Sequence, residues 1–185
     1  MSGARRALLR LWLRAPGSLS RRIAALGRHF AVQTLYQGPL GLTDRERGDV
    51  GNARSWVREV LLRVDGRPLV WARSVTPRRA LGGPWRALRG LGTRPLADLL
   101  FNDRRVRRTP LRREHLLRGS TLQRRLARQW QAATGAPPPR GMVWARSSVF
   151  RRHGPPLRVM EVFAPALTWI KPPRVAPPRV RDTRR

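Results

Sequence analysis

An arginine occupies a position at which a strand pattern predicts an apolar side chain. Residues 55–64, SWVREVLLRV, alternate in polarity so that Arg58 shares one face with Trp56 and Val60. Because an unpaired guanidinium that is removed from water costs several kcal/mol, an anion is expected beside it. The alternative is that this face meets solvent and that the arginine extends into water.

The turn that follows predicts a second arginine on the same face. Asp-Gly at residues 65–66, between two alternating strands, is typical of a two-residue hairpin turn. With that turn, Arg58 lies directly opposite Arg73, and like charges directly opposite each other destabilise a sheet. The pair is therefore predicted to bind an anionic ligand.

A carboxylate shows the same anomaly in a second predicted hairpin, formed by residues 142–151 and 157–163. Glu161 falls on the face of Val159, whereas Arg158 falls on the other face. A carboxylate on an apolar face is paired with arginine, protonated, or both. The pattern indicates either a structural ion pair within the sheet or an enclosed cavity that holds an arginine and a carboxyl group. Such a cavity suits a small aromatic or cyclic carboxylate, which arginine binds in a bidentate fork.

Two predicted helix starts offer further groups that bind anions. The backbone amides of Leu19 and Leu96 lie in first turns, where N–H groups lack partners within the helix. His29, His115 and His153 show neither metal-ligand spacing nor a triad partner, and are interpreted as surface residues. The chain has no cysteine and no glycine-rich phosphate loop, so no metal or nucleotide cofactor is predicted.

The formal net charge of +30 fits nucleic acid, anionic membrane surfaces and anionic small molecules alike. Nearly all of the cationic residues are arginine, as is typical of a protein from a GC-rich genome. Because genome composition can account for them, the charge is only weak evidence of function. A nucleic-acid-binding protein is one alternative, although no recognition helix or RNA-binding sheet motif is present. A transit peptide is another, since no acidic residue precedes Asp44. The same segment has the spacing of an amphipathic helix that packs Leu8, Leu11, Trp12 and Ala15.

The elements predicted around these residues make one α+β domain with a mainly antiparallel sheet, over residues 1–170. The predicted helices are residues 5–15, 20–30, 83–91, 93–101 and 121–130, and the predicted strands are residues 32–37, 55–64, 67–75, 142–151 and 157–163. Residues 38–53 are predicted to be a loop, and residues 102–120 show no clear pattern. The Pro- and Arg-rich residues 171–185 have too little apolar surface to fold, and a disordered tail is predicted there.

Four segments together resemble the chorismate pyruvate-lyase family. They are SWVREVLLRVDGRPLVWARSVTP (55–77), LGGPWRALRGLGTRPLADLLF (81–101), VWARSSVF (143–150) and PLRVMEVFAPAL (156–167). The W-x-R-E and E-x-F-x-P-A spacings within them are similar to those of the family. The resemblance covers residues 8–167, and is weak across residues 102–140.

The resemblance implies an α+β fold in which helical flaps cover a buried ligand site. It also implies a monomeric, cytoplasmic enzyme that converts chorismate to 4-hydroxybenzoate and pyruvate without a cofactor, as the first step of ubiquinone biosynthesis. A protein of the same fold that binds an aromatic acid without turnover is a further alternative. The basic surface favours peripheral contact with an anionic membrane, and nucleic acid is not expected as a partner.

The family's ligand contacts carry over to the side chains of Arg58 and Glu161 and to the backbone at Leu19 and Leu96. Both side chains are expected to be catalytic. Arg58, helped by Arg73 and the two amides, is expected to bind the ring carboxylate of chorismate. Glu161 is expected to hydrogen-bond the 4-hydroxyl group and to assist removal of the nearby proton.

Overall fold

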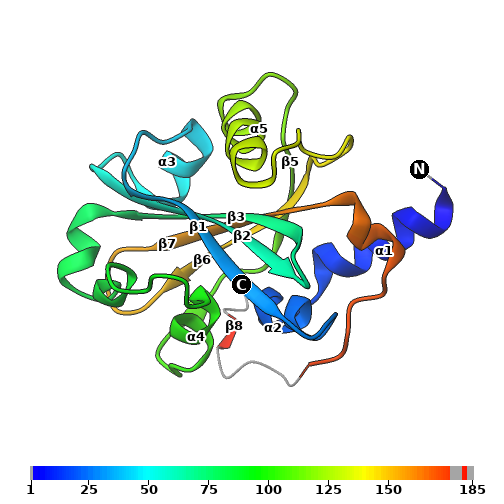
Figure 1. Cartoon of the computed structure of the whole chain (residues 1–185). Helices are drawn as coiled ribbons and strands as arrows, with labels where there is room; N and C mark the ends of the chain where they lie inside the picture. The colour runs from blue at the N-terminus through cyan, green and yellow to red at the C-terminus, as the bar shows by residue number, and fades with distance from the viewer. Residues whose placement is uncertain (1, 176–180, 183–185) are drawn as a thin grey trace.

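A mainly antiparallel sheet organises the chain in the computed structural model, which describes residues 2–175 and 181–182 (Figure 1). In these residues the strand order is β1-β2-β3-β7-β6-β4-β8, with β5 also pairing β6 and only β4–β8 parallel. The strands are β1 Phe30–Pro39, β2 Ser55–Val64, β3 Arg67–Pro77, β4 Arg107–Arg108, β5 Arg112–His115, β6 Trp144–Arg151, β7 Leu157–Phe163 and β8 Arg181–Asp182. The predicted α+β class is confirmed.

Helices cover both faces of this sheet. The α-helices are α1 Gly3–Arg14, α2 Leu19–Ala24, α3 Asp44–Val50, α4 Leu96–Phe101 and α5 Thr121–Thr134, and the 3-10 helices are η1 Arg78–Gly82, η2 Arg86–Leu88 and η3 Pro165–Trp169. Figure 1 shows α2 and α4 on one face and α3 and α5 on the other. The described helices include none with both the length and the hydropathy of a membrane span.

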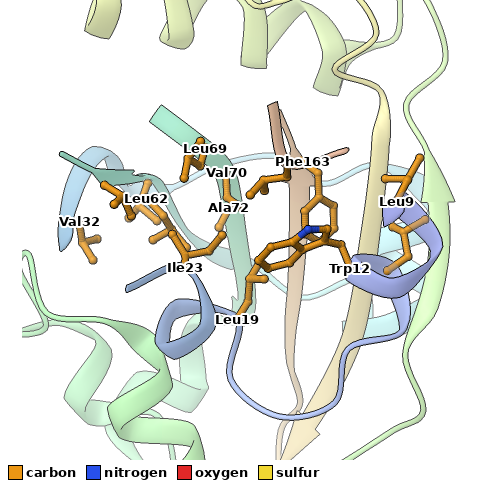
Figure 2. Packing of buried hydrophobic residues seen from close by; sticks show 14 residues of the cluster. Leu9, Trp12, Leu19, Ile23, Val32, Leu62, Leu69, Val70, Ala72 and Phe163 are labelled. Carbon is orange, nitrogen blue, oxygen red and sulfur yellow. The ribbon is translucent and has the colours of Figure 1, made fainter. Parts of the chain in front are cut away.

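The first two helices pack on the sheet through large apolar side chains. Figure 2 shows Trp12, Leu19 and Ile23 directed toward sheet residues that include Ala72 and Phe163. The Trp12 and Phe163 rings lie 6.3 Å apart between centroids. Burial of these side chains holds α1 and α2 over one end of the sheet.

The buried stripe of α1 differs from the predicted one. Trp12 and Ala15 are buried as predicted, but Leu9 and Leu13 take the place expected for Leu8 and Leu11. Leu11 is 45% exposed.

Several predicted boundaries shift for local reasons. The helix predicted over residues 20–30 ends at Ala24, because the chain extends into β1 at Phe30. The loop prediction for residues 38–53 is wrong at α3, which a capping box initiates: the Thr43 hydroxyl accepts from the Glu46 amide, and the Glu46 carboxylate accepts from the Thr43 amide.

The C-terminal side of the chain contains short strands that the sequence pattern does not reveal. β4 and β5 lie within residues 102–120. Of the tail predicted to be disordered, residues 171–175 have no regular secondary structure and Arg181–Asp182 forms β8. Residues 176–180 and 183–185 lie outside the described part of the chain.

The β2–β3 hairpin has the predicted turn. Asp65 and Gly66 have φ angles of 47° and 77°, as the mirror-image turns of tight hairpins require. Val64 pairs with Arg67 beside the turn, as predicted. The pairing then shifts by one residue at a bulge, where Leu69 has no partner on β2.

This bulge places Arg58 and Arg73 on opposite faces of the sheet. Beyond it, Arg58 lies opposite Ser74 and Arg73 lies opposite Glu59. The predicted register, with the two arginines facing each other, is wrong, because one extra residue in a strand reverses the side-chain alternation beyond it.

Arg73 belongs to a buried ion-pair network beneath α3 and α5. Its Nε lies 2.6 Å from Glu46 Oε1 and its Nη1 lies 2.5 Å from Glu59 Oε1. The Nε of Arg125, on α5, lies 2.7 Å from the same Glu59 oxygen. Arg158 also falls on this face, as predicted. Two carboxylates therefore satisfy the Arg73 guanidinium.

We expect Glu46→Gln to destabilise the fold by about 3 kcal/mol at neutral pH, because it leaves the buried Arg73 charge poorly compensated. Burial acts to raise the pKa of Glu46, but the hydrogen bond and charge of Arg73 outweigh it and hold the pKa below 4.5. A carboxyl group whose pKa is depressed by folding adds stability above its unfolded pKa, and that stability is lost as the pH falls through the folded value.

Urea unfolding at several pH values measures this effect. The difference in free energy of unfolding between wild type and Glu46→Gln should become smaller as the pH falls below 4.5. Asp44→Asn is the control, since the Asp44 side chain is 98% exposed and its pairing with Arg47 lies on the surface. An equal loss of stability in both variants at neutral pH would contradict the role given to the network.

Candidate active site

A small cavity of about 50 Å³ lies on the opposite face of the sheet, between the strands and helices α2 and α4. Its walls are mainly aliphatic and aromatic, and include Leu19, Val60, Leu62, Leu96, Phe101 and Phe150. An apolar cavity of this kind strengthens the electrostatic interactions of the few charged groups inside it.

Arg58 lines this cavity with its guanidinium group buried. Its Nη2 donates to the carbonyl oxygens of Gly92 at 2.8 Å and Arg94 at 3.2 Å, in the segment that leads into α4. Its Nε is buried and has no hydrogen-bond partner among the described residues. Burial lowers the pKa of Arg58 to about 10, so the group is still cationic at neutral pH. The guanidinium therefore keeps at least one N–H donor, on Nε, that can bind an anionic ligand.

Glu161 lines the same cavity and is paired with an arginine. Arg146 stands directly opposite it across β6 and β7, and its Nε lies 2.6 Å from Glu161 Oε2. Arg146 Nη1 also donates to the carbonyl oxygens of Ala15 at 2.6 Å and Trp12 at 3.3 Å. The ion pair and the cavity, which the sequence presents as alternatives, are both present.

Arg146 and Arg108 are lining residues that the sequence interpretation misses. Arg146 is 1% exposed, and its Nη2 makes no hydrogen bond within the described part of the chain. Arg108 comes from β4 and donates to the carbonyl oxygen of Gly17 at 3.4 Å. The five-residue connection between β6 and β7 does not fix their register, so the pattern alone could not place Arg146 opposite Glu161.

The charges of the lining favour an anionic ligand. Beside the Arg146–Glu161 ion pair, the lining contains the buried Arg58, whose Nε has no partner among the described residues. The hydroxyl groups of Ser20, Ser74 and Ser148 also line the cavity and supply neutral hydrogen-bonding groups.

The first residues of two helices complete the wall. Leu19 begins α2, where the Ser18 hydroxyl accepts from the Arg21 amide at 3.2 Å, and Leu96 begins α4 after Pro95. Both leucines line the cavity, and first-turn amides have no acceptor within their own helix.

The structure thus brings together four of the five predicted site residues. Arg58, Glu161, Leu19 and Leu96 line one cavity, whereas Arg73 lies on the other face with Glu46 and Glu59. The prediction that Arg73 helps to bind a ring carboxylate is therefore wrong. The three histidines are exposed, as predicted.

Comparison with known proteins identifies the family to which this chain belongs. The family model described as "Chorismate lyase" matches residues 4–172. The chain belongs to the chorismate lyase family. The predicted resemblance and the prediction of an enzyme are confirmed.

Similar curated proteins share most of this chain's length. A protein named "Probable chorismate pyruvate-lyase" from Albidiferax ferrireducens is 50% identical over 162 residues, covering 85% of this chain and 82% of that protein. Proteins with the same name from Azoarcus sp. and Bordetella pertussis are 44% and 38% identical, over 86% and 92% of this chain and 85% and 88% of theirs.

Solved structures with a similar fold are far more distant in sequence. A GntR-family transcriptional regulator from Bacillus cereus has a TM-score of 0.51 at 8% identity, over 80% of this chain and 98% of its own. The effector domain of PhnF from Mycobacterium smegmatis has a TM-score of 0.50 at 14% identity, over 80% and 88%. At these identities the likeness shows the fold alone.

Proposed function

We propose that this protein is a chorismate pyruvate-lyase, which converts chorismate to 4-hydroxybenzoate and pyruvate. The observation that carries the proposal is the placement of Arg58 and Glu161 on the wall of one apolar cavity. Chorismate is a ring of benzenoid size with a carboxylate at C1, a hydroxyl group at C4 and an enolpyruvyl ether at C3. The cavity offers apolar contact for such a ring and cationic donors for its acid group.

Arg58 binds the ring carboxylate in this proposal. Its Nε has no protein partner, and its Nη2 is held by the carbonyl oxygens of Gly92 and Arg94. Holding the guanidinium in place before the ligand arrives reduces the entropy lost on binding. The backbone amides at Leu19 and Leu96 add N–H donors from two helix starts.

Glu161 acts at the other end of the ring, beside the hydroxyl group and hydrogen of C4. The C4–H bond breaks and its electron pair forms the C3=C4 double bond, while the C3–O bond breaks and enolpyruvate leaves. Glu161 accepts the C4 proton, and protonation of the enolpyruvate methylene carbon gives pyruvate. The ring becomes aromatic, which supplies the driving force, so the balance requires neither an oxidant nor a reductant.

The cavity itself contributes by holding the reacting bonds in line and away from water. Its apolar walls come from the sheet on one side and from α2 and α4 on the other. Enclosure of this kind also keeps the leaving enolpyruvyl group near the proton that it must receive.

Arg146 binds the carboxylate of the enolpyruvyl group in the same proposal. Its Nε holds Glu161, while its Nη2 is without a partner in the described residues. One guanidinium would then position both the proton acceptor and the leaving group. This assignment gives each of the two substrate carboxylates an arginine.

We expect Arg146→Lys to raise the KM for chorismate roughly tenfold, because a lysine cannot bind Glu161 and a substrate carboxylate in one planar fork. Binding of 4-hydroxybenzoate, which lacks the second carboxylate, should change less than about twofold. Steady-state kinetics and calorimetry supply the two constants. Arg151→Lys, at the exposed end of the same strand, is the control. Equal weakening of both ligands would contradict the assignment to the enolpyruvyl carboxylate.

Incubation of the purified protein with chorismate tests the proposed function. Equimolar release of pyruvate and 4-hydroxybenzoate is expected, with pyruvate followed through lactate dehydrogenase and the aromatic acid by its absorbance. Tight binding of 4-hydroxybenzoate without pyruvate release would instead favour the aromatic-acid-binding alternative. Binding of nucleic acid that survives the loss of Arg58 would favour the nucleic-acid-binding alternative.

The proposal extends to the setting of the reaction. We propose a monomer that acts in the cytoplasm at the first step of ubiquinone biosynthesis, and whose basic surface contacts an anionic membrane. The absence of cysteine supports a reducing compartment, and the net charge of +30 supports contact with anionic lipids.

A further inference from the structure

Exposed large apolar side chains gather where α1 meets η3. The described part of the chain exposes Leu11, Leu117, Trp144, Trp169 and Ile170. Three of them, Leu11, Trp169 and Ile170, belong to α1 or to the end of η3, and Trp169 is 68% exposed. We call Leu8, Leu11, Trp169 and Ile170 the α1–η3 surface. Clustering of exposed apolar residues marks an interaction site more clearly than their scatter would.

Direct contacts join the two segments that form this surface. The Arg5 guanidinium carbon lies 4.2 Å from the centroid of the Trp169 ring, and Arg5 Nε donates to Thr168 Oγ1 at 3.2 Å. Trp12 Nε1 donates to the carbonyl oxygen of Ile170 at 2.7 Å. Figure 1 shows η3 running beside α1. The exposed indole ring of Trp169 and the neighbouring aliphatic groups are therefore held on a fixed support.

The spacing of residues along α1 places Leu8 and Leu11 in one apolar strip with Trp169 and Ile170. Leu8 follows Arg5 by three residues and precedes Trp12 by four, so it neighbours both on the helix surface. Leu11 follows Leu8 by three residues and is exposed. The strip thus runs from Trp169 and Ile170, along the side of α1 that they contact, to Leu8 and Leu11.

Cationic residues flank the strip. Arg6, Arg10 and Arg14 are exposed and follow one another at four-residue spacing along α1. Lys171 is exposed directly after Ile170. The sequence contains no acidic residue before Asp44. An apolar strip edged by cations matches the interface of an anionic bilayer, where tryptophan rings lie at the headgroup level and arginines meet lipid phosphates.

We propose that the α1–η3 surface docks on an anionic lipid bilayer. Nucleic acid is a poorer fit, because its phosphates would use the arginines but leave Leu11 and Ile170 without an apolar partner. The surface makes specific the membrane contact included in the proposed function. None of the residues of this surface is assigned to the reaction. If the protein does not dock on membranes, the proposed turnover of chorismate is therefore unaffected.

Sedimentation of the full-length protein with lipid vesicles tests the proposal. The vesicles are phosphatidylcholine alone or phosphatidylcholine mixed with phosphatidylglycerol. We expect binding to the mixed vesicles and roughly fivefold weaker binding of Trp169→Ala, because an interfacial aromatic anchor is lost. Leu117→Ala is the control matched in exposure: Leu117 is 70% exposed in the segment between β5 and α5. It should bind within about twofold of wild type.

Two further variants separate the apolar and the charge contributions. Leu11→Ala should weaken vesicle binding at both low and high salt, whereas Arg10→Glu should weaken it mainly at low salt, where screening is small. All four variants should retain wild-type chorismate turnover. Absence of wild-type binding to the anionic vesicles, or equal binding of the Trp169 and Leu117 variants, would overturn the proposal.

Discussion

Replacing Arg58 by alanine is expected to weaken 4-hydroxybenzoate binding by about 100-fold or more. A hydrogen bond to a charged group contributes about 1.5–3 kcal/mol, and a guanidinium offers a carboxylate two of them. The buried Nε of Arg58 has no protein partner in the described residues, so the ligand carboxylate is its natural acceptor. The alanine variant leaves the ligand carboxylate in an apolar cavity without the positive charge of the guanidinium.

Isothermal calorimetry measures this loss directly, with thermal unfolding as the check on folding. Arg63→Ala is the matched control, because Arg63 lies on the same strand but donates to Gln33, Gly66 and Ala133 outside the cavity. Arg58→Lys should fall between wild type and the alanine variant, since it keeps the charge and loses the planar fork. Wild-type affinity in a folded Arg58→Ala variant would remove Arg58 from the site.

Replacing Glu161 by glutamine is expected to lower the turnover of chorismate by roughly 10²–10⁴-fold, the range lost with a general base. Glutamine keeps the size of the side chain and its hydrogen bond to Arg146, so the cavity should keep its shape. Binding of 4-hydroxybenzoate should change far less than turnover, because Glu161 is assigned to proton removal rather than to the ring carboxylate.

Single-turnover measurements separate this effect from product release. Glu161→Asp should recover part of the rate, since it restores a carboxylate at a greater distance from the substrate. A Glu161→Gln variant that turns chorismate over at the wild-type rate would show that positioning by the cavity walls, rather than a base, is responsible for catalysis.

The features that depend on neighbouring residues could be predicted from the sequence. Alternation places Arg58 with Val60, and Glu161 with Val159, and all four residues line the cavity. The Asp65-Gly66 turn also follows from local conformational preference, because both residues adopt the positive φ angles that such turns need.

The features that depend on long-range pairing could not be predicted in this way. The bulge at Leu69 leaves no mark in the polarity pattern, yet it moves Arg73 to the other face and places it beside Glu59. Arg146 reaches Glu161 only through the register of β6 against β7. Arg108 enters the cavity from a two-residue strand, which is too short to show a period.

A crystal structure of the protein with 4-hydroxybenzoate is the most direct test of the central claim, that one cavity binds the ring between Arg58 and Glu161. We expect a ligand carboxylate oxygen within hydrogen-bonding distance of the Arg58 guanidinium, and the ligand hydroxyl group beside the Glu161 carboxylate. A ligand bound outside the cavity, or bound inside it with its carboxylate away from Arg58, would show that these two residues do not bind the ring.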